Sequence, residues 1–568
     1  MKGHWLRVML IVLISSLMLS VVVGVASGQE ERRVLRLAYT QEPPILFDYF
    51  SDLGVAWNLM RIHSLPPWGR DGAGTVVGKL VDVLPSEENG GVVHNLEDGK
   101  TIVSFTLADW AIWSDGTPIT AADFELVFDV SKDGLSNMLE FRFVNGAALD
   151  SVAQGETEKD VIITFSFLQP DWTTATFVPL PNHLLREDYE AALAEGRGMD
   201  TMEWLRAPVV SNGPFLFAEW DSGSFIRYTR NENYAGDVWF DDVVISFYPD
   251  NTVIKQLLVN GETDWTFAIP ILEAQELVNE NSEILALDTF FSGGRMELRF
   301  NQGPNGHPAL RDSRVRQALS MAVDRQFIVD ELYDGNTAIP RSFWDGTPWF
   351  YEGTPQTAYD PEGALALLEE AGWYDDGSGV IASHGVEGVE DGTELALTSA
   401  TYAGGGFTQY QDVLLVVQDM LSEIGIDVTI THYAVNVIHA PFSTDSPYAT
   451  GKHDLFVQGW GVGTSTIDQL ELWSCDSIPS EENDTGWNGI HACYPEMDDL
   501  WDVLGTSLSA DERQDAANQI QTLMAEEAFT LFIVNLLPAL TFNAQLENVS
   551  WHVTDIPWHT LPEWSFAE

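Results

Sequence analysis

The chain has 568 residues, 45 % of them hydrophobic and 20 % charged, which is the composition of a globular protein with about three to four domain-sized units. It contains 86 acidic and 27 basic residues, for a formal net charge of −59. Nucleic-acid binding needs clustered Lys and Arg that displace phosphate counterions, so this charge excludes DNA and RNA as partners. The acidic residues are scattered, and we interpret them as a solvated surface that disfavours anionic ligands.

The first residues have the pattern of an export signal. Lys2 and Arg7 precede an apolar run at 8–25, and the small residues 26–28 lead into a polar segment, as in a secretory leader with its cleavage site. The run is almost long enough to cross a bilayer, so an uncleaved N-terminal anchor is the alternative. No Cys follows the run to carry a lipid. We therefore expect an exported protein, periplasmic or at the cell surface, that is not a lipoprotein.

Strand and helix signals alternate along the rest of the chain. Residues 34–39 and 102–107 have strand patterns, and strand and turn signals dominate up to about residue 300. Apolar residues at helical spacing predict a helix over 312–323. Asp360 with Pro361 predicts a helix start and Gly372 its end, while Ser509 with Glu512 predicts a capping box. The fold class is therefore α/β, and the absence of a repeat period excludes a solenoid or propeller.

The two cysteines, Cys475 and Cys493, lie in a polar, turn-rich stretch. Because export places them in an oxidising compartment, we expect a disulfide between them, worth roughly 3 kcal/mol. A pair of free buried thiols is the alternative. His491 lies nearby, but the spacing lacks the CxxC pairs of a zinc site, so we expect no metal there.

A search for catalytic motifs finds none. The sequence lacks a His-Glu-x-x-His zinc motif, a Gly-x-Ser-x-Gly nucleophile elbow and a phosphate-binding loop. The glycine-rich segments 404–406 and 459–463 do not continue as dinucleotide fingerprints, and we interpret them as tight turns. His432 and His439 could share a helical face, but a structural role is favoured. We predict that the chain is not an enzyme and needs neither a cofactor nor a metal.

The chain is rich in tryptophan, with 20 such residues. Aromatic rings beside glycine turns build clefts that stack on sugar rings or pack around side chains, although most single tryptophans fill cores. The tryptophans in turn-rich segments are Trp57, Trp68, Trp110, Trp113, Trp460, Trp473 and Trp487.

Several segments resemble, in the correct order, the extracytoplasmic solute-binding proteins of family 5, the oligopeptide, dipeptide and nickel type that feeds ABC importers. The most characteristic is the stretch from Phe105 to Leu107 followed by 113–123, a strand, an Asp-Gly turn and a helix capped by Thr120. The resemblance extends from about residue 34 to 545. The other matching segments are 211–215, 230–234, 260–264, 314–318 with 322–325, and 359–361 through 371–373.

The resemblance implies a two-lobed periplasmic-binding-protein fold with hinged lobes, mixed sheets and an extra inserted domain. Ligand would bind between the lobes, which close around it and present it to a membrane permease. The implied partners are a small solute, an oligopeptide or an oligosaccharide, and an ABC permease, and the chain is expected to be a monomer. The implied division is a signal peptide or anchor at 1–28, lobe I at 29–56, 205–300 and 532–568, an inserted domain at 57–204, and lobe II at 301–531.

The resemblance also identifies candidate ligand-binding residues. In peptide-binding members, an Asp three residues after the Trp of a Gly-Trp-x-x-Asp segment pairs with the peptide's α-ammonium, but here Gly463 occupies that place. Another acid could substitute, and Asp468 is the nearest downstream. A peptide-type ligand is the first expectation, a neutral oligosaccharide stacked on Trp460 the alternative, and a secreted glycosidase a more distant one. The candidate cleft residues are Trp460, Gly461, Gly463, Asn301, Tyr39 and Glu42.

Overall fold

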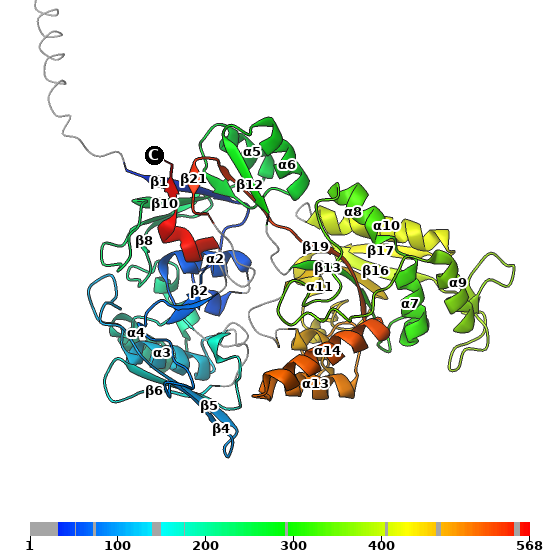
Figure 1. Cartoon of the computed structure of the whole chain (residues 1–568), viewed down its shortest axis with the longest axis horizontal. Coiled ribbons are helices and arrows are strands. Elements are labelled where there is room, and N and C mark those ends of the chain that lie inside the picture. The colour runs from blue at the N-terminus through cyan, green and yellow to red at the C-terminus, as the bar shows by residue number, and fades with distance from the viewer. Residues whose placement is uncertain are drawn as a thin grey trace, which may run out of the picture.

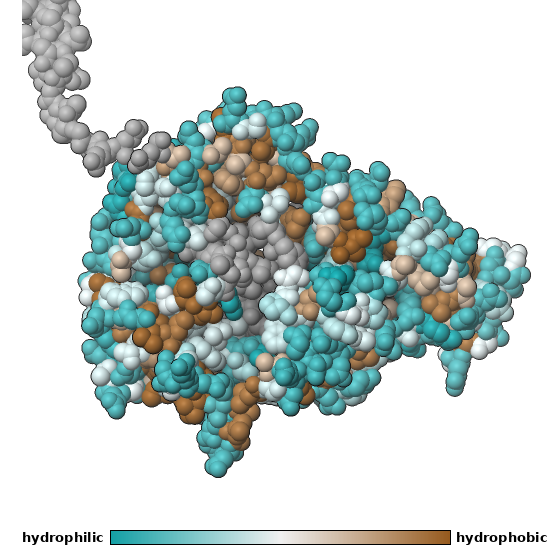
Figure 2. Space-filling view, viewed as in Figure 1, coloured by the Kyte–Doolittle hydropathy of each residue, from teal (hydrophilic) through white to brown (hydrophobic). Residues whose placement is uncertain are grey.

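The computed structural model describes residues 32–51, 53–71, 75–138, 149–174, 177–289, 294–403, 407–461, 467, 469–549 and 557–567. They form two lobes that lie side by side (Figure 1). The leader at 1–28, the glycine segment 404–406, Gly463 and Asp468 lie outside these ranges. Polar residues cover most of the face of both lobes that Figure 2 shows. Helices and strands alternate within each lobe, which confirms the predicted α/β class.

The first lobe is built on a seven-stranded sheet with the order β12-β20-β11-β1-β10-β9-β8. Strand β1 runs parallel to β10 and β11, and the remaining neighbours are antiparallel. Apolar residues from α5 and α6 pack with those of β12 and β20 in a small core. The bounds are β1 Val34–Tyr39, β8 Phe215–Asp221, β9 Phe225–Arg230, β10 Asp242–Phe247, β11 Trp265–Thr266, β12 Leu285–Thr289, β20 Ala539–Asn543, α5 Asn251–Val259 and α6 Ile271–Glu280.

The stretch between β1 and β8 adds a four-stranded antiparallel sheet with the order β4-β5-β7-β6. Its core is continuous with that of the seven-stranded sheet. The predicted helix start at Thr120 is confirmed, since the Thr120 amide donates to Asp123 Oδ2 at 2.7 Å and α3 follows. The bounds are α2 Gly54–His63, β2 Trp68–Arg70, β3 Val76–Gly78, β4 Val92–Asn95, β5 Lys100–Thr106, α3 Ala121–Lys132, β6 Leu149–Gln154, β7 Asp160–Phe165 and α4 Asn182–Ala194.

The second lobe is built on a five-stranded sheet with the order β17-β16-β18-β13-β19. Helices α7, α8, α9 and α10 share a core with one face of the sheet, and α12, α13 and α14 form a second core rich in tryptophan. The bounds are β13 Arg295–Phe300, α7 Ser313–Met321, α8 Arg325–Tyr333, α9 Pro361–Glu370, β16 Leu397–Tyr402, α10 Thr408–Glu423, β17 Val428–Tyr433, α11 Val435–Ile438, β18 Leu455–Trp460, α12 Leu470–Trp473, α13 Pro495–Thr506, α14 Ala510–Glu526 and β19 Thr530–Asn535. Two short ribbons complete the strands, β14 Trp373–Tyr374 with β15 Ala382–Ser383, and β21 Leu546–Glu547 with β22 Ser565–Phe566.

Two of the expected boundaries between the lobes need correction. The division after residue 300 would separate β13 from β18, and the division after 531 would cut β19, yet both strands are paired within the five-stranded sheet. The chain therefore crosses between the lobes between β12 and β13 and again between β19 and β20. The two crossings lie against each other, because the Leu536 amide donates to the Gly294 carbonyl at 2.8 Å. Two adjacent segments that connect two lobes are the usual geometry of a hinge.

The local signals of the later helices are confirmed with small differences. The Gly363 amide donates to Asp360 Oδ1 at 2.9 Å at the start of α9, and Gly372 follows its end with a φ of 85°. Helix α7 ends at Met321 rather than 323. Ser509 caps α14 by accepting from the Glu512 amide at 3.3 Å, but the Glu512 carboxylate accepts from Ser507 and leaves the capping box half formed.

The predicted disulfide between Cys475 and Cys493 is present, with the Cα atoms 4.6 Å apart. The bridge joins the segment after α12 to the residue pair before α13. Among the described residues, no helix has the length and apolar character needed to cross a membrane.

Candidate ligand-binding site between the lobes

The strand directions bring the carboxyl edges of the two large sheets toward each other. Strands β16 and β18 run parallel, and β13 runs opposite to β18, with Arg295 paired to Trp460. The chain enters this lobe at Arg295, so Trp460 at the carboxyl end of β18 faces the other lobe. In the first lobe, β1 ends at Tyr39 on the same edge at which β12 ends and β20 begins. Ligands of open α/β sheets bind outside the carboxyl ends of strands, so the residues at these two edges are the candidate site.

Aromatic side chains gather at this edge of the second lobe. The indole of Trp460 lies edge-on to that of Trp487, with the ring centroids 5.4 Å apart. Trp487 in turn lies 5.4 Å from the His439 ring, whose Nε2 is 2.9 Å from the Tyr402 hydroxyl. Trp460 is half-buried, so part of its ring is free to contact a ligand. The edge therefore offers a stacking surface with a polar rim.

The two glycines beside Trp460 have different surroundings. A Cβ on Gly459 would overlap the hydroxyl of Tyr410, which packs directly on this backbone. Gly461 is exposed and has open space around its Cα. Its carbonyl is held by Gln469 Nε2 at 3.0 Å, and Gln469 Oε1 accepts from Arg295 Nη2 at 2.7 Å. These two hydrogen bonds, from Arg295 to Gln469 and from Gln469 to Gly461, fix the backbone next to Trp460.

A row of buried charges on β13 supports the sheet beneath this edge. Arg295, Glu297 and Arg299 alternate along the strand and share one face, and all three are buried. Arg299 Nε donates to Glu297 Oε1 at 2.8 Å, and the Arg299 guanidinium lies 4.7 Å from the Trp473 ring. Burial lowers the pKa of Arg295 to about 9. The sequence pattern does not reveal this row, because alternating charged and apolar residues are typical of a strand with one solvated face. Gln469 has no local signal either.

Tyr39 lies at the facing edge of the first lobe, but its side chain is only 3 % exposed. Its ring packs edge-on against Phe267, with centroids 5.0 Å apart. Tyr39 is thus a core residue behind the edge.

Glu42 is held by three donors from the β8–β9 hairpin. Its Oε1 accepts from Trp220 Nε1 at 2.7 Å and from the Ser222 hydroxyl and Gly223 amide at 3.0 Å. Partial burial raises the pKa of Glu42, but these hydrogen bonds outweigh it and the pKa is lowered. The carboxylate closes the turn between β8 and β9, which is a structural role.

Asn301 lies just beyond β13, at the end of the strand opposite to Trp460. Its Nδ2 donates to the carbonyls of Gly451 and His453 at 2.7 and 2.5 Å, and its Oδ1 accepts from the Gly303 amide at 2.9 Å. The structure therefore does not bring Asn301 to Trp460 and Gly461, because β13 runs antiparallel to β18.

The two histidines considered as a pair do not share a helix. His432 is an exposed residue of β17, and His439 follows the short helix α11. Within the described part of the chain, no group of three or more His, Cys, Asp or Glu side chains could hold a metal ion.

Similar proteins share this sequence pattern and fold. The family profile of bacterial extracellular solute-binding proteins, family 5 Middle, matches residues 93–476. The oligopeptide-binding protein AppA of Bacillus subtilis is 25 % identical over 405 residues, 69 % of this chain and 67 % of AppA. The probable di/tripeptide-binding protein 5 of Pseudomonas aeruginosa is 24 % identical over 64 % of this chain, and the match spans 63 % of that protein, less than two thirds of its length.

Solved structures match over nearly the whole chain. NikZ from Campylobacter jejuni in complex with Ni(L-His) has a TM-score of 0.76 at 20 % identity, covering 94 % of this chain and all of NikZ. AppA from Bacillus subtilis in complex with a nonapeptide has a TM-score of 0.71 at 21 % identity, covering 95 % of this chain and all of AppA. These likenesses confirm the two-lobed fold. Since the family profile covers most of the chain, the protein belongs to the bacterial extracellular solute-binding proteins of family 5.

Proposed function

We propose that this protein is the extracytoplasmic substrate-binding component of an ABC importer and binds a peptide-type solute between its lobes. The observation that carries the proposal is the edge of Trp460 and Gly461, which faces the first lobe across two adjacent crossing strands. Family membership and the relatives named as oligopeptide- and di/tripeptide-binding support a peptide. The protein binds and releases its solute without making or breaking a bond.

The edge suits a short peptide physically. The indole of Trp460 provides apolar surface, and the open space at Gly461 leaves its backbone free to approach a ligand backbone. The Gly461 carbonyl already accepts from Gln469, but a carbonyl oxygen has a second lone pair for a ligand N–H. A net charge of −59 disfavours anionic solutes and favours neutral or cationic ones.

The location and partners follow from the same proposal. Residues 1–28 direct export and are either cleaved or kept as an anchor, and the protein acts as a monomer outside the cytoplasm without a lipid. The closed form delivers the solute to an ABC permease in the membrane.

A second candidate ligand is an oligosaccharide. The paired indoles of Trp460 and Trp487 favour it, because aromatic faces stack on the apolar faces of sugar rings. The absence of an Asp at position 463 also suits a neutral ligand, since a buried ammonium needs a counter-charge.

Binding measurements distinguish the two candidate ligands. The protein is first freed of bound solute by unfolding and refolding, with its disulfide kept oxidised throughout. Defined peptide pools and oligosaccharide pools are titrated separately while tryptophan fluorescence is recorded, and the bound compound is recovered for mass spectrometry. We expect a saturable response to peptides and recovery of the intact compound. A response to oligosaccharides alone would show that the ligand is a sugar and not a peptide. Recovery of a hydrolysed compound would show that the protein is an enzyme.

A further inference from the structure

One ion pair between described residues joins the two lobes. Arg513 Nη2, in the first turn of α14, lies 2.5 Å from Asp171 Oδ1, which belongs to the part of the first lobe between β1 and β8. The two side chains are 9 % and 20 % exposed, so water screens the pair less than it screens a surface pair. The partners are 342 positions apart in the sequence, and no sequence pattern relates them.

Arg513 is held in place from its own lobe. Its Nε donates to the Leu504 carbonyl in α13 at 3.0 Å. Its guanidinium carbon lies 4.8 Å from the centroid of the Trp349 indole, within the range of a cation–π interaction. These contacts involve residues of the second lobe alone, so they need no contribution from the first lobe.

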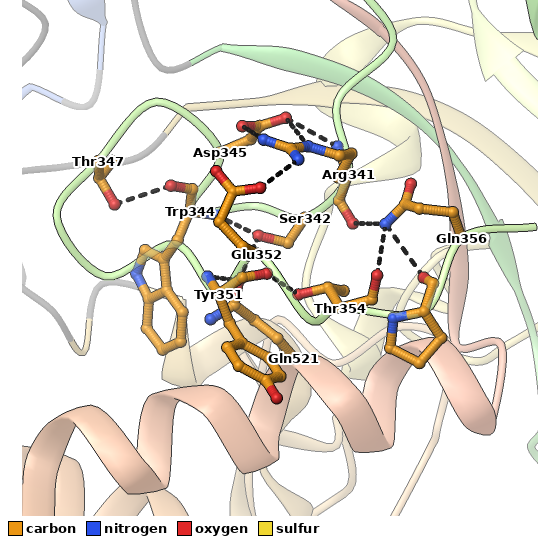
Figure 3. Close-up of polar contacts among 11 residues, drawn as sticks. Arg341, Ser342, Trp344, Asp345, Thr347, Tyr351, Glu352, Thr354, Gln356 and Gln521 are labelled. Carbon is orange, nitrogen blue, oxygen red and sulfur yellow. Dashed lines mark hydrogen bonds and ion pairs between the residues drawn. The ribbon is translucent and has the colours of Figure 1, made fainter.

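The loop that carries Trp349 is itself fastened to α14 (Figure 3). Gln521 Nε2 donates to the Trp349 carbonyl at 2.9 Å, and Gln521 Oε1 accepts from the Ser342 hydroxyl at 2.8 Å. Arg341 in the same loop pairs with Glu352 at 2.8 Å. The loop therefore holds the indole against Arg513 through bonds made within one lobe.

On the other side, the backbone that carries Asp171 is fixed within the first lobe. The Asp171 carbonyl accepts from the Thr174 amide at 2.9 Å and from the Thr174 hydroxyl at 2.8 Å. Trp68 Nε1 donates to the Thr173 carbonyl at 2.9 Å, and the Trp68 ring packs edge-on against Trp172 at 5.5 Å. The Arg513 guanidinium and the backbone that carries the Asp171 carboxylate are thus held by their own lobes.

We infer that Asp171 and Arg513 form a positioning pair that sets the balance between open and closed lobes, an inference that rests on the proposed function. The crossings near β12 and β19 form the hinge, and α14 lies well below them in Figure 1. A hinge motion that separates the lobes moves such a point apart and exposes both charges to water. Because the guanidinium and the backbone at Asp171 are held in place beforehand, the pair forms at a reduced entropic cost and favours closure.

The test measures lobe separation without any ligand. Dyes are attached to cysteines at two exposed positions, Glu187→Cys on α4 and Asp502→Cys on α13, with the native disulfide kept oxidised. Energy transfer between the dyes then reports the fraction of closed molecules. We expect Asp171→Asn to reduce the closed-to-open ratio about tenfold, because it removes the charge partner of a guanidinium that stays in place.

Controls separate this role from a structural one. The swapped pair, Asp171→Arg with Arg513→Asp, is expected to recover part of the lost energy transfer, whereas each single reversal lowers it. The matched control is Glu219→Gln, which breaks a 3.1 Å pair with Arg227 inside the first lobe and should leave energy transfer unchanged. Unchanged energy transfer in Asp171→Asn, or equal loss in the swapped and single variants, would overturn the inference. Failure to bind peptides would not affect this measurement and would count against the proposed function alone.

Discussion

At the scale of single residues, the candidate site rests on how Trp460 is held. Gly459 admits Tyr410 behind the strand, Gln469 fixes the Gly461 carbonyl, and Arg295 fixes Gln469. These contacts fix the backbone on both sides of Trp460 at the carboxyl edge of β18, so this backbone has little freedom left to lose on binding, which favours affinity.

Replacing Trp460 with Ala should weaken ligand binding at least tenfold, about 1.4 kcal/mol, because the stacking surface is lost. The measurement is fluorescence or calorimetric titration with the peptide recovered from the stripped protein. Trp110→Ala is the matched control. Trp110 is 40 % exposed, and its indole N–H donates to Asp82 in the first lobe, whereas Trp460 belongs to the second lobe. Unchanged affinity in Trp460→Ala would remove Trp460 from the site.

Replacing Glu297 with Gln should destabilise the protein by about 3–5 kcal/mol, because Arg299 would keep a buried charge without its partner. The Arg299 side chain is 0 % exposed and the Glu297 side chain is 1 % exposed. Urea unfolding provides the measurement, and Glu219→Gln in the exposed pair with Arg227 should cost less than about 1 kcal/mol. Equal effects in the two variants would show that the buried row does not support the fold.

Three buried histidines predict a loss of stability in acid. Burial lowers the pKa of His63, His439 and His453 to about 4 each. The ordinary histidine pKa is about 6.5, and the native value is about 4. Between these two pH values the unfolded chain binds protons that the native chain does not, so the free energy of unfolding falls as the pH is lowered.

Comparison of variants isolates this effect from the titration of the many carboxylates. His63→Gln should flatten the fall of the unfolding free energy over this pH range, measured by urea unfolding at several pH values. His432→Gln, at an exposed position of β17, should leave the slope unchanged. Identical slopes in both variants would contradict the prediction.

The residue scale also shows what a sequence can and cannot predict about this site. Trp460 was identified as a candidate because residues 459–463 resemble the Gly-Trp-x-x-Asp segment of the family. Asn301 was misplaced because its strand runs antiparallel to β18, and strand direction depends on pairing between distant segments. The buried row on β13 was missed because its alternation of charged and apolar residues suggests a solvated face, whereas helices cover both faces of this strand.

At the scale of elements, the local rules predicted more than the pairing rules did. Asp360 caps α9 and Ser509 caps α14 as expected, because capping involves residues three apart. The boundaries at 300 and 531 failed because β13 and β19 join a sheet whose other strands lie between them in the chain. No signal within a strand indicates which sheet it joins.

The Cys475–Cys493 bridge closes the segment between α12 and α13, beside the tryptophan-rich core of the second lobe. Thiol titration of the unfolded, unreduced protein should find no reactive thiol. Replacing both cysteines with Ala should lower the unfolding free energy by roughly 3 kcal/mol, because the open loop gains entropy in the unfolded state. Two reactive thiols in the unreduced protein would refute the bridge.

At the scale of the whole molecule, two lobes are joined by two adjacent crossings of the chain. The two crossings are held together at Gly294 and Leu536, and we expect the lobes to move about them. The family resemblance predicted this two-lobed arrangement, which composition and periodicity alone could not. The charge of −59 still excludes nucleic acid, and it also disfavours anionic solutes.

The central claim is that a solute binds between the lobes and closes them. Small-angle X-ray scattering of the stripped protein during titration with its recovered peptide tests this most directly. The account predicts that the radius of gyration falls and saturates at one peptide per chain, and that Trp460→Ala requires more peptide for the same fall. Saturable binding with an unchanged radius of gyration would contradict it.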